Sequence, residues 1–297
     1  MSFRTPDGPT LMEKFIKANE VELCAETFGD PAEPPVLLVG NTMLTWHDDL
    51  CARLAALRRF VVRYDLRDTG RSTAADPEAP GYTLRDLVAD AAGVLDAFGL
   101  TCAHVAGFGA GGWIAQLLAL DHPARVATLT LIATRPTAPG PSDPDLPEHA
   151  PELMARLMDP PEVDWTDRAS VAAFMVESRR HRAGPAFDAA EAREDIERIY
   201  DRTPVAADPG KAHRANQMAT AFAALDSGPR WRERLGAIAV PTLVIHGEDD
   251  PFFPLGNGQA LADEIPSAEL ITLPATGNEL PRRTWDTVVP AILRHTS

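Results

Sequence analysis

The sequence predicts an α/β protein built on a mostly parallel sheet with an inserted helical cap. Strand-length apolar runs alternate with helical patterns through the first third of the chain, and the same alternation resumes near its end. The stretch 136–234 between them reads as helices, with proline and acidic residues at its start. At 297 residues the chain can hold one sheet-based core with a large insertion. We therefore expect residues 1–135 and 235–297 to form the core and 136–234 the cap.

The core elements follow one another in the order that a parallel sheet requires. Val36 begins the first buried apolar run, and the β-branched run from Val126 is long enough for another buried strand. Leu84, Leu87 and Leu95 fall at helical spacing. The expected strands are 36–39, 60–64, 104–107, 126–133, 242–246 and 270–273, and the expected helices are 46–57, 82–98, one ending near 122, 258–265 and 281–295.

Composition and charge restrict the partners. The formal net charge of −15 disfavours phosphate backbones and anionic membranes, so we expect neither nucleic acid nor a membrane as a partner. Hydrophobic residues make up 45% of the chain, yet no apolar run approaches the roughly 18 residues that a membrane span needs. The N-terminus, starting at Met1, has no apolar region of the signal-peptide type. We therefore predict a cytoplasmic protein.

The cysteines and histidines offer few candidates for chemistry. Cys24, Cys51 and Cys102 lie far apart without a paired metal spacing, which fits reduced thiols and predicts no metal site. His47 and His213 could face a cleft. Four other histidines fall at or near the ends of expected elements, and a structural role is expected for them: His104, His122, His246 and His295.

Three landmarks stand out along the chain: the loop after Val39, the strand-turn-helix at 107–111 (GFGAG) and the acidic loop at 247–251 (GEDDP). In these landmarks the chain resembles the α/β-hydrolase superfamily, and the likeness covers most of its length. The stretch 63–72 (RYDLRDTGRS) resembles the branch that includes aclacinomycin methylesterase. This resemblance implies an α/β-hydrolase fold, with an eight-stranded sheet and an inserted helical cap.

The same resemblance identifies the positions of a hydrolytic triad, and two of them hold unusual residues. Gly109 stands where the family's Gly-x-Ser-x-Gly turn has its nucleophilic serine, so no serine ester can form. Asn278 stands where the family has its histidine base, and an amide cannot take up a proton near neutral pH. Asp250 matches the family's acid and is expected to brace its loop. The protein is therefore not expected to act as an ordinary esterase.

The glycine run 107–112 also fits the dinucleotide-binding pattern Gly-x-Gly-x-x-Gly between a strand and a helix. That interpretation requires an acidic residue at the end of the following strand, where the chain has Thr134, Arg135 and Pro136. Arg135 could meet a 2′-phosphate, so this alternative stays open. The preferred interpretation has no cofactor and no metal.

A cleft between sheet and cap is expected to bind a bulky, mainly hydrophobic small molecule or modified peptide. Loop residues should border the former oxyanion site, and apolar cap residues at helical spacing could face either the cleft or the packing of the cap itself. The cleft should be apolar, with few ionisable groups. The predicted ligand-binding residues are Asn41, Thr42, Met43, Trp46, Phe108, Ala110, Phe174, Met175, Met218, Phe222 and Asn278.

Such a pocket suits chemistry driven by positioning and desolvation, in which the substrate supplies its own acid or base. The first hypothesis is a non-hydrolytic tailoring enzyme of antibiotic biosynthesis, namely an epimerase or isomerase of a modified peptide, similar to the atypical bottromycin epimerases. The second is a non-catalytic binding or carrier protein for a hydrophobic metabolite. The third is residual esterase activity through water held by Asp250 and Asn278, which Asp250→Asn would abolish.

Overall fold

An eight-stranded sheet forms the centre of the computed structural model, which describes residues 13–76, 78–140, 143–204 and 208–297. The strand order is β1-β2-β4-β3-β5-β6-β7-β8, with antiparallel pairing of β1 with β2 and of β2 with β4, and parallel pairing elsewhere. The predicted mostly parallel, eight-stranded sheet is therefore confirmed. The strands are β1 Lys14–Ala18, β2 Val21–Phe28, β3 Pro35–Val39, β4 Phe60–Tyr64, β5 Ala103–Phe108, β6 Val126–Ile132, β7 Thr242–Gly247 and β8 Ala268–Leu273.

The apolar-run pattern does not locate the strands β1 and β2. In β1 only Ile16 and Ala18 are buried, while Lys14, Phe15 and Lys17 are exposed. An edge strand with one solvated face alternates apolar and polar residues instead of showing a continuous apolar run. This segment therefore lacks the signal that locates the central parallel strands.

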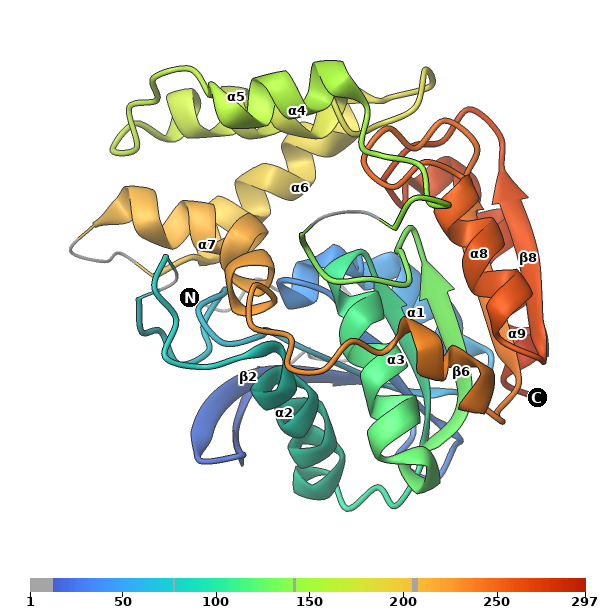
Figure 1. Ribbon diagram of the computed structural model, residues 1–297. Helices are drawn as coiled ribbons and strands as arrows, with labels where there is room; N and C mark the ends of the chain where they lie inside the picture. The colour runs from blue at the N-terminus through green and yellow to red at the C-terminus, as the bar shows by residue number, and fades with distance from the viewer. Residues whose placement is uncertain (1–12, 77, 141–142, 205–207) are drawn as a thin grey trace.

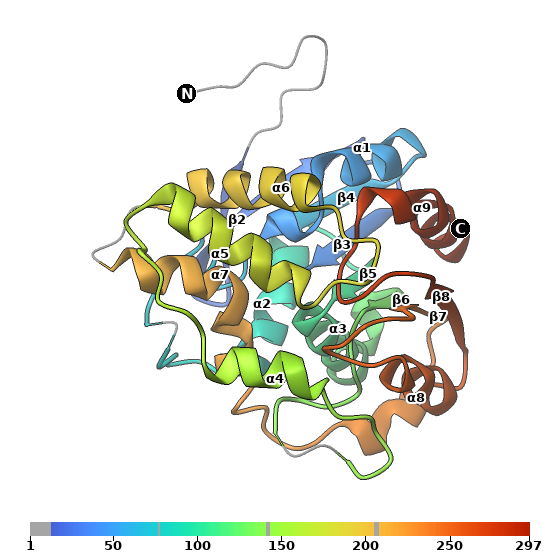
Figure 2. The ribbon, with the colours of Figure 1, turned by 90° about the horizontal axis from the view of Figure 1, so that it is seen from above.

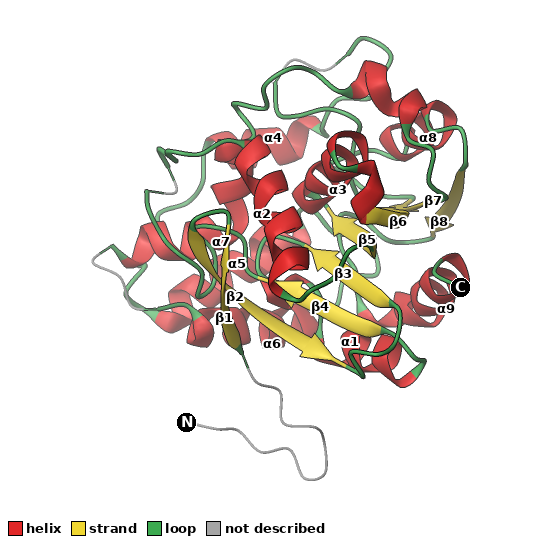
Figure 3. Ribbon diagram, turned by 90° about the horizontal axis from the view of Figure 1, so that it is seen from below, coloured by secondary structure: helices red, strands yellow, loops and turns green. Residues whose placement is uncertain are grey.

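Helices cover both faces of the sheet, as Figure 3 shows from below. One face carries α2 (Leu84–Ala97), α3 (Ala110–Asp121) and α8 (Gly256–Glu264), and the other carries α1 (Asp48–Ala56) and α9 (Trp285–His295). All five lie where the sequence predicts helices. The last one starts later than expected, because a 3₁₀ turn precedes Trp285.

Four helices of the cap lie above the carboxyl ends of the parallel strands (Figures 1 and 2). They are α4 (Pro151–Met158), α5 (Arg168–Arg180), α6 (Ala189–Arg202) and α7 (Pro209–Ala223). Helices α5 and α6 pack against each other through a small apolar cluster of their own. The helical character expected for the insertion agrees with these elements, whereas its boundaries as a separate domain stay a prediction.

The fold does not test the predicted cytoplasmic location. The segment around Met1, on which the signal-peptide argument rests, lies outside the described residues. Within the described residues, no helix combines the length and the apolar character needed to cross a membrane.

Candidate functional site

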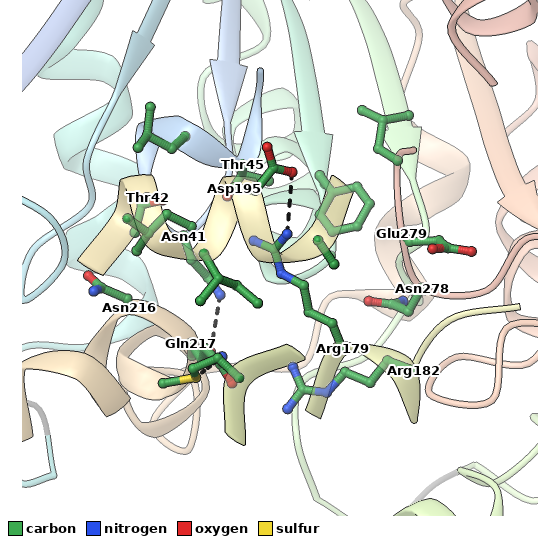
Figure 4. Close-up of a pocket in the computed structure, with 18 of the residues that line it drawn as sticks. Asn41, Thr42, Thr45, Arg179, Arg182, Asp195, Asn216, Gln217, Asn278 and Glu279 are labelled. Atoms are coloured by element: carbon green, nitrogen blue, oxygen red, sulfur yellow. Dashed lines mark hydrogen bonds and ion pairs between the residues drawn. The ribbon is translucent and has the colours of Figure 1, made fainter. Parts of the chain in front are cut away.

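A cavity of about 260 Å³ lies between the carboxyl ends of the parallel strands and the cap (Figure 4). We call its two sides the core wall and the cap wall. The core wall comes from the loop after β3, the turn between β5 and α3, the loop after β7 and the loop after β8. The cap wall comes from α5, α6, α7 and the loop between α5 and α6.

The turn between β5 and α3, hereafter the elbow, places Gly109 in the core wall. Gly109 has φ 56° and ψ −121°, a conformation that glycine adopts without a Cβ clash. A Cβ added at Gly109 would meet no atom within 4 Å apart from its chain neighbours, so there is space beside this residue. Ala110 begins α3, and the first N–H groups of a helix have no partner within it. The elbow thus presents backbone N–H groups to an empty space.

The rest of the glycine run has a packing role. A Cβ at Gly111 would approach the carbonyl oxygen of Val39 to 2.3 Å, and a Cβ at Gly107 would approach that of Gly111 to 2.4 Å. Because these contacts are shorter than real Cβ contacts, α3 can start this close to β3 and β5 only with glycine. The run therefore needs no dinucleotide to explain it.

Asn278 lies beside the elbow and is held by three hydrogen bonds. Its Nδ2 donates to Asp250 Oδ2 at 2.8 Å and to the carbonyl oxygen of Ala133 at 3.1 Å. Its backbone N–H donates to the carbonyl oxygen of Arg182 at 2.7 Å, which ties the β8 loop to the cap. With both amide protons engaged, Oδ1 is the free acceptor, and Figure 4 shows it directed into the cavity.

Asp250 lies behind Asn278 and has no exposed side-chain surface. Its Oδ1 accepts the backbone N–H groups of Phe252 and Phe253, both at 2.8 Å. Burial raises the pKa of Asp250 to about 7, while the hydrogen bonds from Asn278, Phe253 and Phe252 act to lower it. Asp250 is not part of the cavity wall. Its contacts fit the predicted bracing of the loop and leave no direct path to a water in the cavity.

The predicted ligand-binding residues separate into two groups. Seven of them lie in the cavity wall, and whether they bind a ligand stays a prediction: Asn41, Thr42, Phe108, Ala110, Met175, Met218 and Asn278. Four do not reach the cavity. Met43 and Trp46 are fully buried in the core side, because a 3₁₀ turn directs them under the loop. Phe174 packs edge-on against Trp165 within the cap at 5.6 Å, and Phe222 lines a separate depression beside Tyr82.

The cavity is more charged than the sequence predicted. Arg179 and Arg182 from the end of α5 and the loop after it line the cavity, together with carboxylates of α6 and of the β8 loop. The expectation of few ionisable groups is therefore wrong. Met175 and Arg179 stand four residues apart on α5, a spacing that places their side chains on one face of the helix. This spacing could have identified Arg179, whereas Arg182 lies in the turn after the helix and had no such signal.

The histidines and cysteines add no nucleophile at the elbow. His213 lines the cavity, where it stacks on Tyr200 with ring centroids 4.3 Å apart, and burial lowers its pKa. His47 instead caps α1, its Nδ1 accepting from Asp49, and is absent from the wall. Burial raises the pKa of both Cys24 and Cys51 to about 12, so neither is a thiolate. Among the described residues no three metal-ligating side chains gather closely enough to hold an ion.

Comparison with known proteins identifies the family. The sequence pattern of the alpha/beta hydrolase fold family matches residues 35–280. The chain belongs to this family. It is 34% identical to rhodomycin D methylesterase DauP of Streptomyces sp. (strain C5), with 95% of this chain and 97% of the relative covered. It is 32% identical to rhodomycin D methylesterase DnrP of Streptomyces peucetius, again over 95% and 97%.

Further similarities point the same way. A putative carbamate hydrolase, RutD of Variovorax paradoxus (strain S110), is 33% identical over 84% of this chain and 86% of the relative. Among solved structures, the 2-hydroxy-6-oxo-6-phenylhexa-2,4-dienoate hydrolase of Rhodococcus sp. strain RHA1 aligns with a TM-score of 0.72 at 22% identity, covering 96% of this chain and 98% of that chain. This structural likeness supports the fold.

The comparisons overturn the first functional hypothesis. The relatives in this family are named methylesterases and carbamate hydrolases, and none of those described above is an isomerase or epimerase. The prediction of an epimerase or isomerase is therefore wrong. It followed from treating the side chains at Gly109 and Asn278 as decisive, although backbone donors and a shaped cavity are also parts of a hydrolase site.

Proposed function

We propose that this α/β-hydrolase is a slow esterase in which water attacks the substrate directly, without a covalent enzyme intermediate. Gly109 and Asn278 take the positions at which the family has its nucleophile and its base. The observation that carries the proposal is the space at Gly109, at the N-terminus of α3, in a cavity that Asn278 also lines. An ester carbonyl can meet the backbone donors there, with a water in the place of a serine hydroxyl.

In this reaction the backbone N–H groups stabilise the developing oxyanion. The N–H of Ala110 and a donor of the Asn41–Thr42 loop correspond to the two sources that build the oxyanion hole in this fold. Asn278 Oδ1 accepts a hydrogen bond from the attacking water and orients it, while Asp250 fixes the amide. Water adds to the carbonyl carbon, the alkoxide leaves with the proton that the water gives up, and the products are an acid and an alcohol.

Because no side chain at the elbow acts as a base, the rate enhancement is limited. Oxyanion stabilisation and binding without a triad leave about 10³–10⁴-fold catalysis over water. The methyl ester of rhodomycin D is the first substrate to test, since rhodomycin D methylesterases are 32–34% identical to this chain.

The test removes one backbone donor. Ala110→Pro deletes an N–H at the first position of α3, where proline is compatible with a helix. We expect hydrolysis of a rhodomycin D methyl ester, followed by liquid chromatography, to fall about 100-fold. Ala110→Ser keeps the N–H and should stay within a few-fold of the parent. Unchanged turnover in a folded Ala110→Pro variant, or an acyl adduct by intact-protein mass spectrometry, would count against direct attack by water.

A second candidate, a non-catalytic binding protein, is favoured by one observation. Asp250 is the carboxylate that contacts the side chain of Asn278, and it is sealed from the cavity. If no protein group takes up the proton of the attacking water, the protein binds its ligand without converting it. Saturable binding of the methyl ester with no acid product after long incubation would support this candidate and contradict the esterase.

A further inference from the structure

Arg182 is a cation in the cavity without an anionic partner. Its Nε is buried and makes no hydrogen bond, and no ion pair joins its guanidinium to a carboxylate among the described residues. The guanidinium lies over the ring of Phe252, 5.3 Å from its centroid, a contact that engages none of its N–H donors. Burial and the charge of Arg179 lower the pKa of Arg182, whereas Asp250 raises it.

The neighbouring carboxylates do not compensate this charge. Asp195 faces Arg179 at 3.4 Å and Arg282 at 3.8 Å. Glu279 accepts from the backbone N–H of Gly184 at 3.1 Å and pairs with Arg283 at 3.3 Å. Figure 4 shows the guanidinium of Arg179 directed at Asp195, while that of Arg182 has no such contact.

The two remaining acidic residues of the wall accept hydrogen bonds from backbone N–H groups. Asp188 caps α6 by accepting from the N–H of Ala190 at 2.8 Å. Glu191 accepts from the backbone N–H of Arg282 at 2.8 Å. An arginine presents five N–H donors in a planar fork, and a part-buried arginine without acceptors is costly in the empty protein. A ligand that supplies two oxygens in one plane removes this cost.

We propose that Arg182 binds a carboxylate of the ligand, so that the cavity takes molecules with an ionised carboxyl group beside an apolar body. The backbone oxygen of Arg182 accepts from the N–H of Asn278 at 2.7 Å, which places the two residues side by side. A carboxylate on Arg182 is then held in the same cavity as the space at Gly109. The inference rests on the proposed function in one respect: it takes the ligand to carry an ester in addition to the carboxylate. The substrate class is then an ester that also carries a free carboxylate.

A carboxylate fits this site better than a phosphate. A single guanidinium matches the two oxygens of a carboxylate in its own plane. A phosphate carries more charge, and the nearby Asp195 and Glu279 would repel a dianion more strongly than a monoanion.

The experiment compares two ligands that differ in one charge. Monomethyl terephthalate has an ester and a carboxylate on one ring, and dimethyl terephthalate is its neutral counterpart. By titration calorimetry on the full chain we expect the monoester to bind about tenfold or more tightly than the diester. Arg182→Met should reduce this preference to about twofold, and Arg182→Lys should keep part of it. Arg180→Met is the matched control, because Arg180 pairs with Glu177 and is not part of the cavity wall.

Stability separates a binding role from a structural one. Removing an uncompensated cation should leave the melting temperature of the ligand-free Arg182→Met variant unchanged or raise it. A variant that unfolds or melts earlier would overturn the proposal, since the guanidinium would then be a structural group. Equal binding of the two esters by the parent, or equal protection of the parent by inorganic phosphate, would also overturn it.

Release of methanol distinguishes this inference from the proposed function. Charge-selective binding without methanol release supports the carboxylate site and contradicts the esterase. Methanol release from both esters, with equal affinities, supports the esterase and contradicts the carboxylate site.

Discussion

The core wall of the cavity holds the turn at Gly109 and the amide side chains of Asn41 and Asn278, whereas the cap wall holds, beside apolar side chains, both of the arginines that line the cavity. The core wall holds the space at Gly109, the first turn of α3 and Asn278 Oδ1, all fixed by close packing or hydrogen bonds. The cap wall holds Arg179 and Arg182, of which only Arg179 has a carboxylate partner. From this difference we infer that the core wall binds the reacting group of the ligand and that the cap wall selects the rest of the ligand.

The largest expected effect comes from adding a nucleophile and a base to the core wall. Gly109→Ser combined with Asn278→His places a hydroxyl and an imidazole at the elbow, with Asp250 behind the imidazole. We expect ester hydrolysis to rise roughly 10²–10⁴-fold over the parent, the range of an added general base. Initial rates with the methyl ester, and a covalent adduct after treatment with a fluorophosphonate, measure this change.

Each single variant is the control for the pair. Gly109→Ser alone has no base, and Asn278→His alone has no nucleophile, so neither should gain more than a small part of the increase. The side chain of Ser at position 109 has room, but its backbone stays at φ 56°, which costs about 1–3 kcal/mol of stability. A double variant that is folded but no faster than the parent would show that the core wall does not present an ester at Gly109.

The next prediction compares how much stability the packing behind each of the two walls contributes. Trp46 is fully buried between the sheet, α1 and α9, whereas Phe174 is part-buried in the small apolar cluster of the cap. Trp46→Ala should lower the free energy of unfolding by about 3–5 kcal/mol. Phe174→Ala should cost roughly 1–2 kcal/mol, in proportion to the smaller area that it buries. Urea denaturation followed by circular dichroism measures both, and equal losses would mean that the cap is packed as firmly as the core.

The sequence predicted the core better than the cap wall, for a physical reason. Buried parallel strands leave continuous apolar runs, and the elbow leaves its glycines, so the positions of Gly109, Asn278 and Asp250 could be predicted from the sequence alone. The edge strand β1 alternates between exposed and buried residues and left no such run.

The cap wall was harder because a charged residue on an amphipathic helix is usually assigned to the solvated face. Arg179 near the end of α5 and Arg182 in the turn after it instead face inward, since the cap covers a cavity and not a packed core. The prediction that Met43 and Trp46 line the cavity was wrong for the opposite reason. A short 3₁₀ turn after Thr42 rotates these two apolar side chains away from the cavity. A turn of three residues leaves no periodic signal in the sequence.

The last comparison tests how the core wall is held together, through the dependence of stability on pH. The pKa of Asp250 is about 7 in the folded protein and near 3.8 in the unfolded chain. Between these values the folded state keeps a proton that the unfolded state has lost. The contribution of Asp250 to stability therefore falls as the pH rises from about 4 to about 7, and it is constant above that range.

Asp250→Asn removes this titration, so the difference in stability between the parent and the variant should favour the parent most near pH 4 and least near pH 8. Chemical denaturation at several pH values measures this difference. Asn278→His supplies a cation beside the carboxylate and should lower the pKa of Asp250, shifting the decline to lower pH. A constant difference between parent and Asp250→Asn across the range would show that the carboxylate is ionised throughout. Asn278 would then be held by a full negative charge, and its amide would be fixed more firmly at the elbow than the neutral form allows.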